Sequence, residues 1–489
     1  MDKLNVCLIN DSFPPMIDGV ANAVTNYAQI ITRSHGRAAV VTPYYPDADD
    51  SVYPFPVFRY PSLDLTKYVG YRAGVPFSPE LMQKLKEQRF DLIHSHCPVA
   101  STMLARVLRE QICVPLVFTY HTKFDIDIAN VVRSKLLQEE AARLLVANVA
   151  ACDEVWTVSR GAGENLEKLG YQGEWSVMPN GVDFPRGRVS EEQIAQIGAA
   201  CDLPAELPLF LFVGRMMWYK GIRIILDALK ALRESGRDFR MVFVGGGGDK
   251  DEIVDYCASL GLSDCVFFEP PIRDRELIRA WYCRADLFLF PSTFDTNGLV
   301  VREAAACALP SVLVRGSCAA EDVTDGVNGF LIEENADSMA AMLRELIGER
   351  ETMKRVGEYA QRELYISWEE SVARAYERYG AVLERWRGGG YPEHANFSDE
   401  VFRATAQAMD SYNRAHERLL DRRHELEAER RALREELQSG RGEMLRGLKD
   451  GGQELLRDLK GSGQELLSGA MEKRRKVLES LEDYYDRFL

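Results

Sequence analysis

The stretch LFLFVGR, residues 209–215, restarts a pattern that the preceding part of the chain has already run through once. Short apolar or β-branched runs alternate with helical periodicity over residues 1–183, and this alternation returns from residue 209 onward. The earlier runs are LNVCLIN, AAVVTP, DLIHSH, PLVFTYH and EVWTVS, and the later ones continue with RMVFVGG, CVFFEP, DLFLFPS and PSVLVR. Alternating strands and helices build a parallel sheet with helices on both faces. The sequence therefore predicts an α/β protein with two doubly wound domains in tandem.

The domain boundaries follow from the same pattern. We expect a first domain over 1–183 and a second over 184–366, with a hinge near 183–206. A helix over 367–386 is expected to cross back to the first domain, and a linker at 387–397 precedes a helical extension over 398–489. The other predicted helices cover 19–33, 79–88, 99–110, 131–150, 220–234, 249–260, 273–284, 298–308 and 337–363.

Composition narrows the function classes. The net charge of -15 argues against a nucleic-acid-binding protein, because an acidic surface repels a polyanion. No apolar run reaches the length of a membrane span, and the N-terminal LNVCLIN is typical of a strand rather than a signal peptide. The ten cysteines form no CxxC pair, as in a protein with reduced thiols. We therefore expect a cytoplasmic location.

The extension carries two different periods. Aromatic or leucine side chains recur every seven residues at 412, 419, 426 and 433, which indicates a coiled-coil seam, although His416, Arg423 and Arg430 interrupt it. We therefore consider 398–437 a possible homo-oligomerisation helix. Beyond it, glutamates at 443, 454 and 465 and leucines at 445, 456 and 467 repeat every eleven residues.

The eleven-residue repeat has two interpretations. It is compatible with a second oligomerising helix. It is also compatible with a helix over 440–489 that lies on a membrane surface, with Lys449, Lys460 and the basic cluster 473–476 near anionic headgroups. The glutamates weaken the membrane interpretation, so both remain open.

Three motifs follow predicted strands, where open α/β sheets bind their ligands. In PPMIDGVANAV, Gly19 permits close backbone approach, and the following helix offers free amides to an anion. In VGRMMWYKG, Arg215 and Lys220 could clamp a diphosphate, because arginine binds two oxygens at once and lysine acts as a point charge. The alternative for this second motif is a solvated turn.

The third motif is FDTNGLVVREA, residues 294–304. A helix is expected to open at Asn297 and Gly298, with outward-pointing amides at Gly298, Leu299 and Val300 that could hold phosphate or sugar oxygens. The carboxylates of Asp295 and Glu303 suit the hydroxyls of a hexose and a ribose. The alternatives are a helix N-cap for Asp295 and an ordinary helix-face acid for Glu303.

No metal site is expected. HSHC at 94–97 follows a strand and has no second cluster of ligands. DID at 125–127 is similar to a metal-binding motif of a different fold, and here it fits the surface or the acceptor side better.

Taken together over residues 3–386, these motifs resemble the family 4 retaining glycosyltransferases, which have two Rossmann-like domains in the GT-B fold. The resemblance also includes TYHTKF, PNGVD at 179–183, SCAAEDVTDGVNGFLIEEN and SWEESVARAYERY. The chain departs from the family at Asp295, where a glutamate is usual. NDSFPPMIDGVANAV, YHTKFD and TNGLVVREA are similar to the branch of diacylglycerol glucosyltransferases and lipid mannosyltransferases.

The resemblance implies roles for individual residues. Arg215 and Lys220 would bind the donor diphosphate, Asp295 the transferred sugar and Glu303 the ribose. His121 would lie by the primary hydroxyl of the sugar, where an orienting role fits better than a general base. The remaining implied donor contacts are Gly19, Ile272, Asn297, Gly298, Leu299 and Val300.

The resemblance also implies a reaction. A hexose would pass with retention from UDP- or GDP-hexose to an acceptor hydroxyl, in a front-face substitution without a cofactor or catalytic metal. The leading hypothesis is a lipid acceptor, such as diacylglycerol or a glycolipid, on the inner face of the cell membrane. The alternatives are a soluble or polysaccharide acceptor, with the tail as an oligomeriser, and a non-catalytic nucleotide-sugar-binding scaffold.

Overall fold

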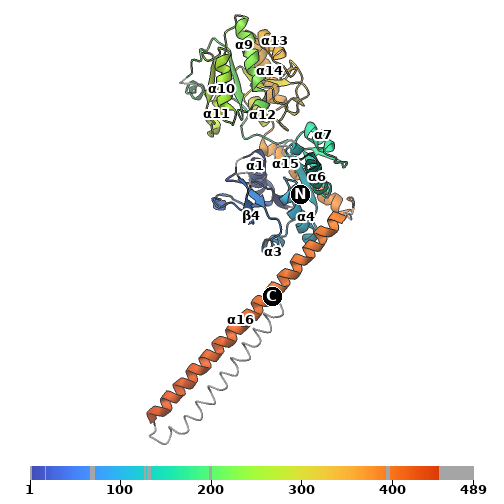
Figure 1. Cartoon of the computed structure of the whole chain (residues 1–489), viewed down its shortest axis with the longest axis vertical. Coiled ribbons are helices and arrows are strands. Elements are labelled where there is room, and N and C mark those ends of the chain that lie inside the picture. The colour runs from blue at the N-terminus through green and yellow to red at the C-terminus, as the bar shows by residue number, and fades with distance from the viewer. Residues whose placement is uncertain are drawn as a thin grey trace. The chain divides into compact units, whose positions relative to one another are not determined.

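The computed structural model describes residues 3–16, 18–66, 72–125, 128, 134–197, 201–392 and 397–450 (Figure 1). The chain separates into two compact units, Met1–Ala406 and Gln407–Leu489. The first unit contains two parallel sheets, which confirms the predicted pair of doubly wound α/β domains. Figure 1 shows α9 to α14 gathered around one sheet, and α1, α4, α6, α7 and α15 around the other.

The first sheet has the strand order β3-β2-β1-β6-β7-β8-β9, and its ladders are parallel. Its strands are β1 Asn5–Ile9, β2 Arg37–Pro43, β3 Val57–Tyr60, β6 Leu92–Ser95, β7 Leu116–Tyr120, β8 Glu154–Thr157 and β9 Ser176–Val177. The helices around it are α1 Gly19–Ile30, α3 Pro79–Glu87, α4 Ala100–Ile112, α6 Lys135–Ala150 and α7 Arg160–Lys168. A short antiparallel pair, β4 Ser62–Asp64 and β5 Arg72–Gly74, lies outside this sheet.

The second sheet has the order β12-β11-β10-β13-β14-β15, and it is also parallel. Its strands are β10 Leu209–Val213, β11 Arg240–Val244, β12 Val266–Glu269, β13 Leu287–Phe290, β14 Ser311–Val314 and β15 Phe330–Ile332. The helices of this half are α8 Glu191–Ala195, α9 Ile222–Glu234, α10 Lys250–Ser259, α11 Arg275–Arg284, α12 Leu299–Ala306, α13 Ala336–Leu346 and α14 Arg350–Glu363. Short helical turns are η1 Ile31–His35, η2 Asp50–Val52, η3 Trp218–Lys220 and η4 Cys318–Ala320.

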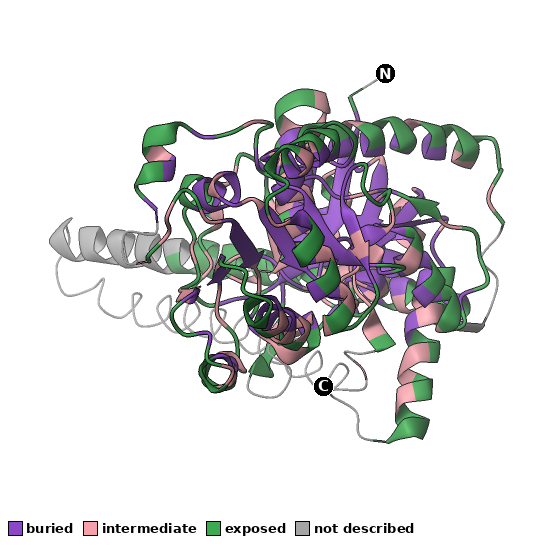
Figure 2. Cartoon of the chain, turned by 90° about the horizontal axis from the view of Figure 1, so that it is seen from above, coloured by how far each residue is buried: buried purple, intermediate pink, exposed green. Residues whose placement is uncertain are grey.

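The central strands of both sheets are buried, as helices on both faces require. Every residue of β1 and β7 is buried, and Figure 2 shows the strands as a purple layer inside partly exposed helices. The strand order reverses between β1 and β6 in the first sheet and between β10 and β13 in the second. Such reversal points leave a crevice beyond the carboxyl ends of the strands, where ligands of open α/β sheets bind.

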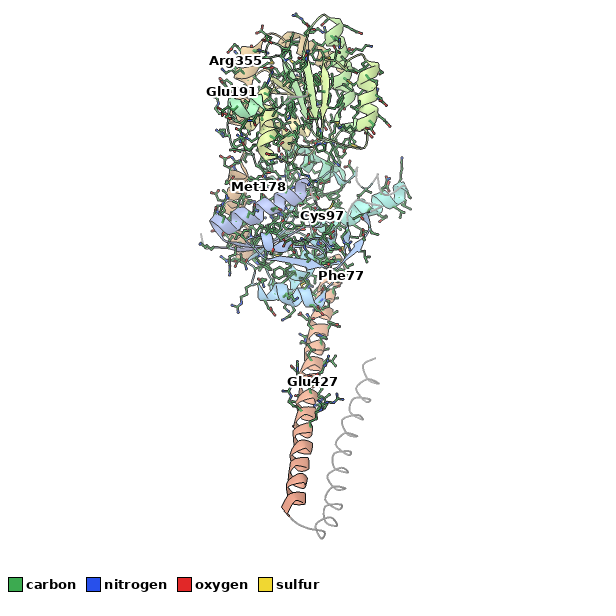
Figure 3. The ribbon with its side chains drawn as sticks, turned by 90° about the vertical axis from the view of Figure 1, so that its left-hand side faces the viewer. Phe77, Cys97, Met178, Glu191, Arg355 and Glu427 are labelled. Atoms are coloured by element: carbon green, nitrogen blue, oxygen red, sulfur yellow. The ribbon has the colours of Figure 1, made fainter. Side chains whose placement is uncertain are left out.

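The chain passes from one sheet to the other and then returns. Met178 and Glu191, labelled in Figure 3, lie in the first and second halves, so the first crossing falls between them. The return is α15, Trp368–Arg387, which corresponds to the helix expected over 367–386. Its Tyr376 hydroxyl accepts from the Leu4 amide at 2.8 Å, and its Tyr379 hydroxyl bonds His94 at 2.6 Å.

One predicted helix is wrong in extent. The segment 337–363 is divided into α13 and α14, because Ile347 is extended and Gly348 has a φ of 97°, in the left-handed region that glycine tolerates. Apolar spacing carries on across this break, and for that reason the sequence pattern alone suggested one helix. The helix expected over 131–150 begins at Lys135 among the described residues.

The final described helix, α16 Phe397–Asp450, begins inside the first unit. There, Asp399 forms a fully buried ion pair with Arg106 of α4 at 2.7 Å, and the Arg106 guanidinium lies 3.9 Å from the Phe402 ring centroid. The Gln111 side-chain amide donates to the Ala406 carbonyl at 3.1 Å. These contacts anchor the first three turns of α16 on α4.

The rest of α16 belongs to the second unit and runs without a break through the SGRG segment at 439–442. Tyr412 and Leu419 of the predicted seven-residue repeat are exposed, and Leu426 is half-buried. Most of the eleven-residue repeat, at 451–489, lies outside the described residues. Within the described ranges, no helix combines the length and hydropathy that a membrane crossing requires.

We predict that Asp399→Asn destabilises the first unit by about 3 kcal/mol, because it leaves the buried Arg106 cation without its counter-charge. Urea unfolding measures the loss, and limited proteolysis within 397–406 reports release of the helix. The matched control is Glu400→Gln, which neutralises an exposed acid one residue away. An equal loss of stability in both variants would contradict the assignment of Asp399 as the anchor.

Candidate active site

Lys220 stands where the loops after β10 and β13 meet. It ends η3, and Gly221 behind it adopts a φ of 75°, in the left-handed region. A Cβ on Gly221 would collide with the Pro291 carbonyl just after β13, so only glycine lets the two loops approach this closely. The KG pair of the second motif is thereby explained by backbone packing as well as by charge.

Lys220 is buried and forms an ion pair with Asp295 at 2.6 Å. The Ser292 hydroxyl donates to the other Asp295 oxygen at 2.5 Å. Burial lowers the pKa of Lys220, Asp295 opposes that shift, and the charge of Arg215 adds to it. Aromatic rings surround the ammonium, with centroids at 5.4 to 5.8 Å; they belong to Tyr219, Phe290 and Phe294. Arg215 itself follows β10 and is exposed.

The helix after this loop starts without a side-chain cap. Gly298 is the N-cap residue of α12, with a φ of 58°, and a Cβ there would lie 2.9 Å from Ala319 Cβ. The N-cap interpretation of Asp295 is therefore wrong, because its carboxylate bonds Lys220 and Ser292 instead. The amides of the first helical turn, including Leu299 and Val300, have no acceptor within the helix.

Asn297, immediately before that N-cap, is buried, and its side-chain Nδ2 has no hydrogen-bond partner among the described residues. A buried amide nitrogen without an acceptor is costly, and a bound acceptor atom would satisfy it. Asn297 therefore adds a donor beside the amides of the α12 turn. Together they form an N–H-rich edge next to Lys220.

Glu303 is held by α11. Its carboxylate accepts from Arg275 at 2.7 Å and from the Tyr282 hydroxyl at 3.0 Å, and 13% of its side chain is exposed. Burial raises the pKa of Glu303, while the Arg275 charge opposes the shift. Arg275 also lies 3.7 Å from Asp183 of the PNGVD motif. Glu303 is thus part of a mostly buried charged network on the face of α12, and its role toward a ribose stays a prediction.

The remaining candidate residues of the second half lie in loops at the carboxyl ends of its strands. Ile272 is in the loop after β12 and packs partly against the core of the second sheet. The glycine run 245–248 packs on the loop after β10, where the Met216 amide donates to the Gly246 carbonyl at 2.9 Å. A Cβ on Gly245 or Gly247 would collide with that loop, so the run serves close packing.

From the first half, His121 follows β7 and is buried. Its Nε2 lies 3.0 Å from His96 Nδ1, and its Nδ1 lies 3.5 Å from the amide nitrogen of Asn180. Burial lowers the pKa of His121 to about 3, so the ring is neutral near pH 7. Both ring nitrogens face protein partners, so the ring can hold the side chains of His96 and Asn180 in a fixed orientation.

Gly19 begins α1 and is exposed, and a Cβ there would meet no atom within 4 Å. The packing of the chain therefore does not itself demand glycine at this position. The expectation of free amides at the start of α1 is wrong in part, because the Asp18 carboxylate accepts from Val20 and Ala21 at 2.8 and 2.7 Å.

The candidate metal motifs have other partners. His94 bonds Tyr379 and Thr119, and His96 bonds His121. In the described part of the chain, no group of three or more histidine, cysteine or acidic side chains could hold a metal ion. Asp125 is exposed, and residues 126 and 127 of the DID string lie outside the described residues.

The structure thus brings Lys220 and Asp295 into contact, places Glu303 in a separate network, and sets His121 across from them in the first half. Sequence analysis missed Arg275 and Ser292. Arg275 lies in IRDREL, where two arginines flank an acid, and nothing in that pattern distinguishes it from a surface charge. The substrate roles of these residues stay predictions.

Comparison with known proteins identifies the family to which the chain belongs. Residues 17–186 match the family described as Glycosyltransferase Family 4, and residues 195–363 match Glycosyl transferases group 1. A D-inositol 3-phosphate glycosyltransferase of Thermobifida fusca is 30% identical over 351 residues, which cover 67% of this chain and 78% of the relative. An alpha-monoglucosyldiacylglycerol synthase of Acholeplasma laidlawii is 24% identical over 352 residues, covering 68% of this chain and 86% of that enzyme.

Among solved structures, Anabaena Alr3699/HepE in complex with UDP-glucose superposes with a TM-score of 0.59. The identity is 20%, and the match covers 77% of this chain and 100% of that one, so it bears on the fold. The chain belongs to the group 1, family 4 glycosyltransferases, and it is a hexosyltransferase with the GT-B fold.

We predict that the buried histidines make the first unit acid-sensitive. The folded pKa of His121, about 3, lies below the ordinary value of about 6.5, so its contribution is present above pH 6.5 and is lost as pH falls toward 3. In His121→Asn, urea unfolding free energies should fall less steeply between pH 6 and 4, by about 1.4 kcal/mol per pH unit. His416→Asn, at an exposed position, is the control; identical slopes in His121→Asn and wild type would contradict the prediction.

Proposed function

We propose that the chain transfers a hexose with retention from a nucleotide-diphosphate sugar to a hydroxyl of a membrane lipid, such as diacylglycerol or a glycolipid. The observation that carries the donor half of this proposal is the buried Lys220–Asp295 pair beside the uncapped start of α12. It supplies a fixed cation, a carboxylate for sugar hydroxyls and a row of amides for phosphate oxygens. The Anabaena protein is seen in complex with UDP-glucose, which supports a donor of this class.

The chemistry follows from these charges. Breaking the sugar–phosphate bond develops negative charge on the diphosphate and positive charge at the anomeric carbon. Arg215, Lys220 and the α12 amides stabilise the leaving diphosphate where its charge develops. Because two side-chain cations already serve the diphosphate, we propose that the reaction needs no metal. The leaving phosphate then accepts the proton of the acceptor hydroxyl, and a front-face substitution retains the anomeric configuration.

Asp295 distinguishes this site from the usual family pattern. Its carboxylate is one methylene shorter than the customary glutamate, and here it reaches both Lys220 and Ser292. We propose that it still binds hydroxyls of the transferred sugar and that its shorter reach affects which hexose is accepted. We propose that the donor is a UDP- or GDP-hexose and that its base contacts the loop after β12 that carries Ile272.

The lipid acceptor rests on relatives and on the tail. The name alpha-monoglucosyldiacylglycerol synthase describes a glucosylated lipid. We propose that 440–489 holds the enzyme on the inner face of the cell membrane. A soluble or polysaccharide acceptor is the second candidate; exposed Tyr412 and Leu419 on α16 favour the oligomerising tail that accompanies it. Membership of an enzyme family argues against a non-catalytic scaffold.

We expect nucleoside diphosphate release from a UDP- or GDP-hexose, stimulated by diacylglycerol vesicles and unchanged by EDTA. Lys220→Met should weaken nucleoside diphosphate binding by about 10- to 100-fold in calorimetry, because it removes a charge-assisted contact. Lys230→Met changes an exposed lysine of α9 in the same half and serves as control. Product anomer analysis by NMR tests retention. Donor binding that Lys220→Met leaves intact would exclude the proposed diphosphate site.

The tail is tested by co-sedimentation with phosphatidylglycerol–phosphatidylcholine vesicles. A truncation after Ala406 keeps the buried Arg106–Asp399 pair, so it removes the second unit without unseating the first. We expect the full chain to pellet with vesicles and the truncated chain to stay in solution. Equal pelleting would remove the tail from the membrane proposal. An oligomer in light scattering that dissociates on truncation, without vesicle binding, would favour the soluble acceptor.

A further inference from the structure

The two halves meet at the loop that carries Asp295. The Thr296 hydroxyl donates to the backbone carbonyl of His121 at 2.7 Å, and the Lys123 ammonium donates to the backbone carbonyl of Thr293 at 3.2 Å. Both contacts run between the segment after β7 and the segment after β13. Asp295 lies between the two threonines in the sequence, so its place relative to His121 depends on both bonds.

On its own side, this loop has three further attachments. Asp295 bonds Lys220 and Ser292, and the Thr293 hydroxyl donates to Glu334 at 3.2 Å. These bonds fix the loop within the second half. Among the described residues, the contacts from His121 and Lys123 relate it to the first half, which carries the predicted acceptor side.

Lys123 has the properties that such a contact needs. It is half-buried, and it lies two residues after His121 in the TYHTKF string. Its ammonium carries three N–H donors on a flexible stem, so it can follow a carbonyl whose position varies. Its acceptor is a backbone carbonyl, and the bond therefore depends directly on the position of the loop backbone.

A second contact between the halves lies elsewhere. The Glu321 carboxylate accepts from the Arg160 amide at 2.7 Å and from the Gly161 amide, at the start of α7. A Cβ on Gly161 would lie 2.5 Å from Cys318 Sγ, so the approach is close. Glu321 thus joins the halves without touching the Asp295 loop. Changing Glu321 therefore tests general contact between the halves separately from the positioning of this loop.

We propose that Lys123 is a positioning residue of hexosyl transfer. Reaching across from the first half, it holds the Thr293 carbonyl and so places Asp295 and the start of α12 opposite the His121 side. The donor diphosphate is bound by Arg215, Lys220 and the α12 amides of the second half, and transfer requires the loop to be positioned by the first half. This inference rests on the proposed donor site, and it adds a residue that the family resemblance did not assign.

The kinetic test compares Lys123→Met with wild type and with Lys84→Met, which changes an exposed lysine of α3 in the same half. We expect Lys123→Met to lower kcat for transfer by about 10- to 100-fold, because small misplacements of reacting groups are costly. The nucleoside diphosphate Kd should stay within about twofold, because the cations that bind it are untouched. Lys123→Arg should restore most of the rate, and Lys84→Met should match wild type.

Glu321→Gln is the decisive comparison. It weakens the other contact between the halves, and we expect its kcat to stay within about threefold of wild type. If it lowers kcat as much as Lys123→Met does, the Lys123 bond serves only general contact, and the proposal is overturned. A nucleoside diphosphate Kd that weakens in step with kcat in Lys123→Met would make Lys123 a donor ligand instead. Wild-type kcat in Lys123→Met would also overturn it.

Hydrogen exchange gives a readout that does not depend on activity. Peptides covering 292–300 should exchange faster in Lys123→Met than in wild type, and unchanged in Lys84→Met. If wild type transfers no hexose, the proposed function fails, while faster exchange would still support Lys123 as an anchor of this loop. Unchanged exchange would refute the anchor whatever the enzyme activity.

Discussion

The ion pair between Lys220 and Asp295 is the constraint on which the rest of the site depends. An ammonium removed from water is costly unless a counter-charge and hydrogen bonds compensate it, and here one carboxylate and three aromatic rings surround it. Because the pair joins the loops after β10 and β13, neither loop can move without breaking it. Gly221 makes the arrangement possible by admitting the Pro291 carbonyl where any side chain would collide.

From that pair the site extends in two directions. Toward α11, Glu303 forms a second charged network with Arg275. The two acidic residues of the FDTNGLVVREA motif therefore have different partners. Toward the first half, backbone carbonyls of His121 and Thr293 accept bonds from across the interface. Residues from both halves thus contact the loop after β13. The returning helix α15 holds the first sheet through bonds to Leu4 and His94.

Sequence reasoning succeeded where physical properties are local. Alternating buried strands and helices predicted both sheets, and glycines at strand ends marked the loops of the site. It failed where one hydrogen bond, one ion pair or one backbone angle decides the outcome. The α1 amides are occupied by Asp18, Glu303 is tied to Arg275, and a helix expected to span 337–363 breaks at Gly348. Apolar periodicity does not show that one residue adopts a left-handed backbone conformation. A charge pattern does not show which residue is the counter-ion of a given charge.

The sequence by itself determined the two α/β domains, the family and the residue types that we propose for the donor site, because strand periodicity and strand-end motifs are properties of short segments. Only the tertiary structure decided which of those residues touch. Lys220 and Asp295 are 75 positions apart, and Lys123 and Thr293 are 170 apart. Contacts at such separations arise from strand order and from the approach of two sheets. No short segment of the sequence determines either of these.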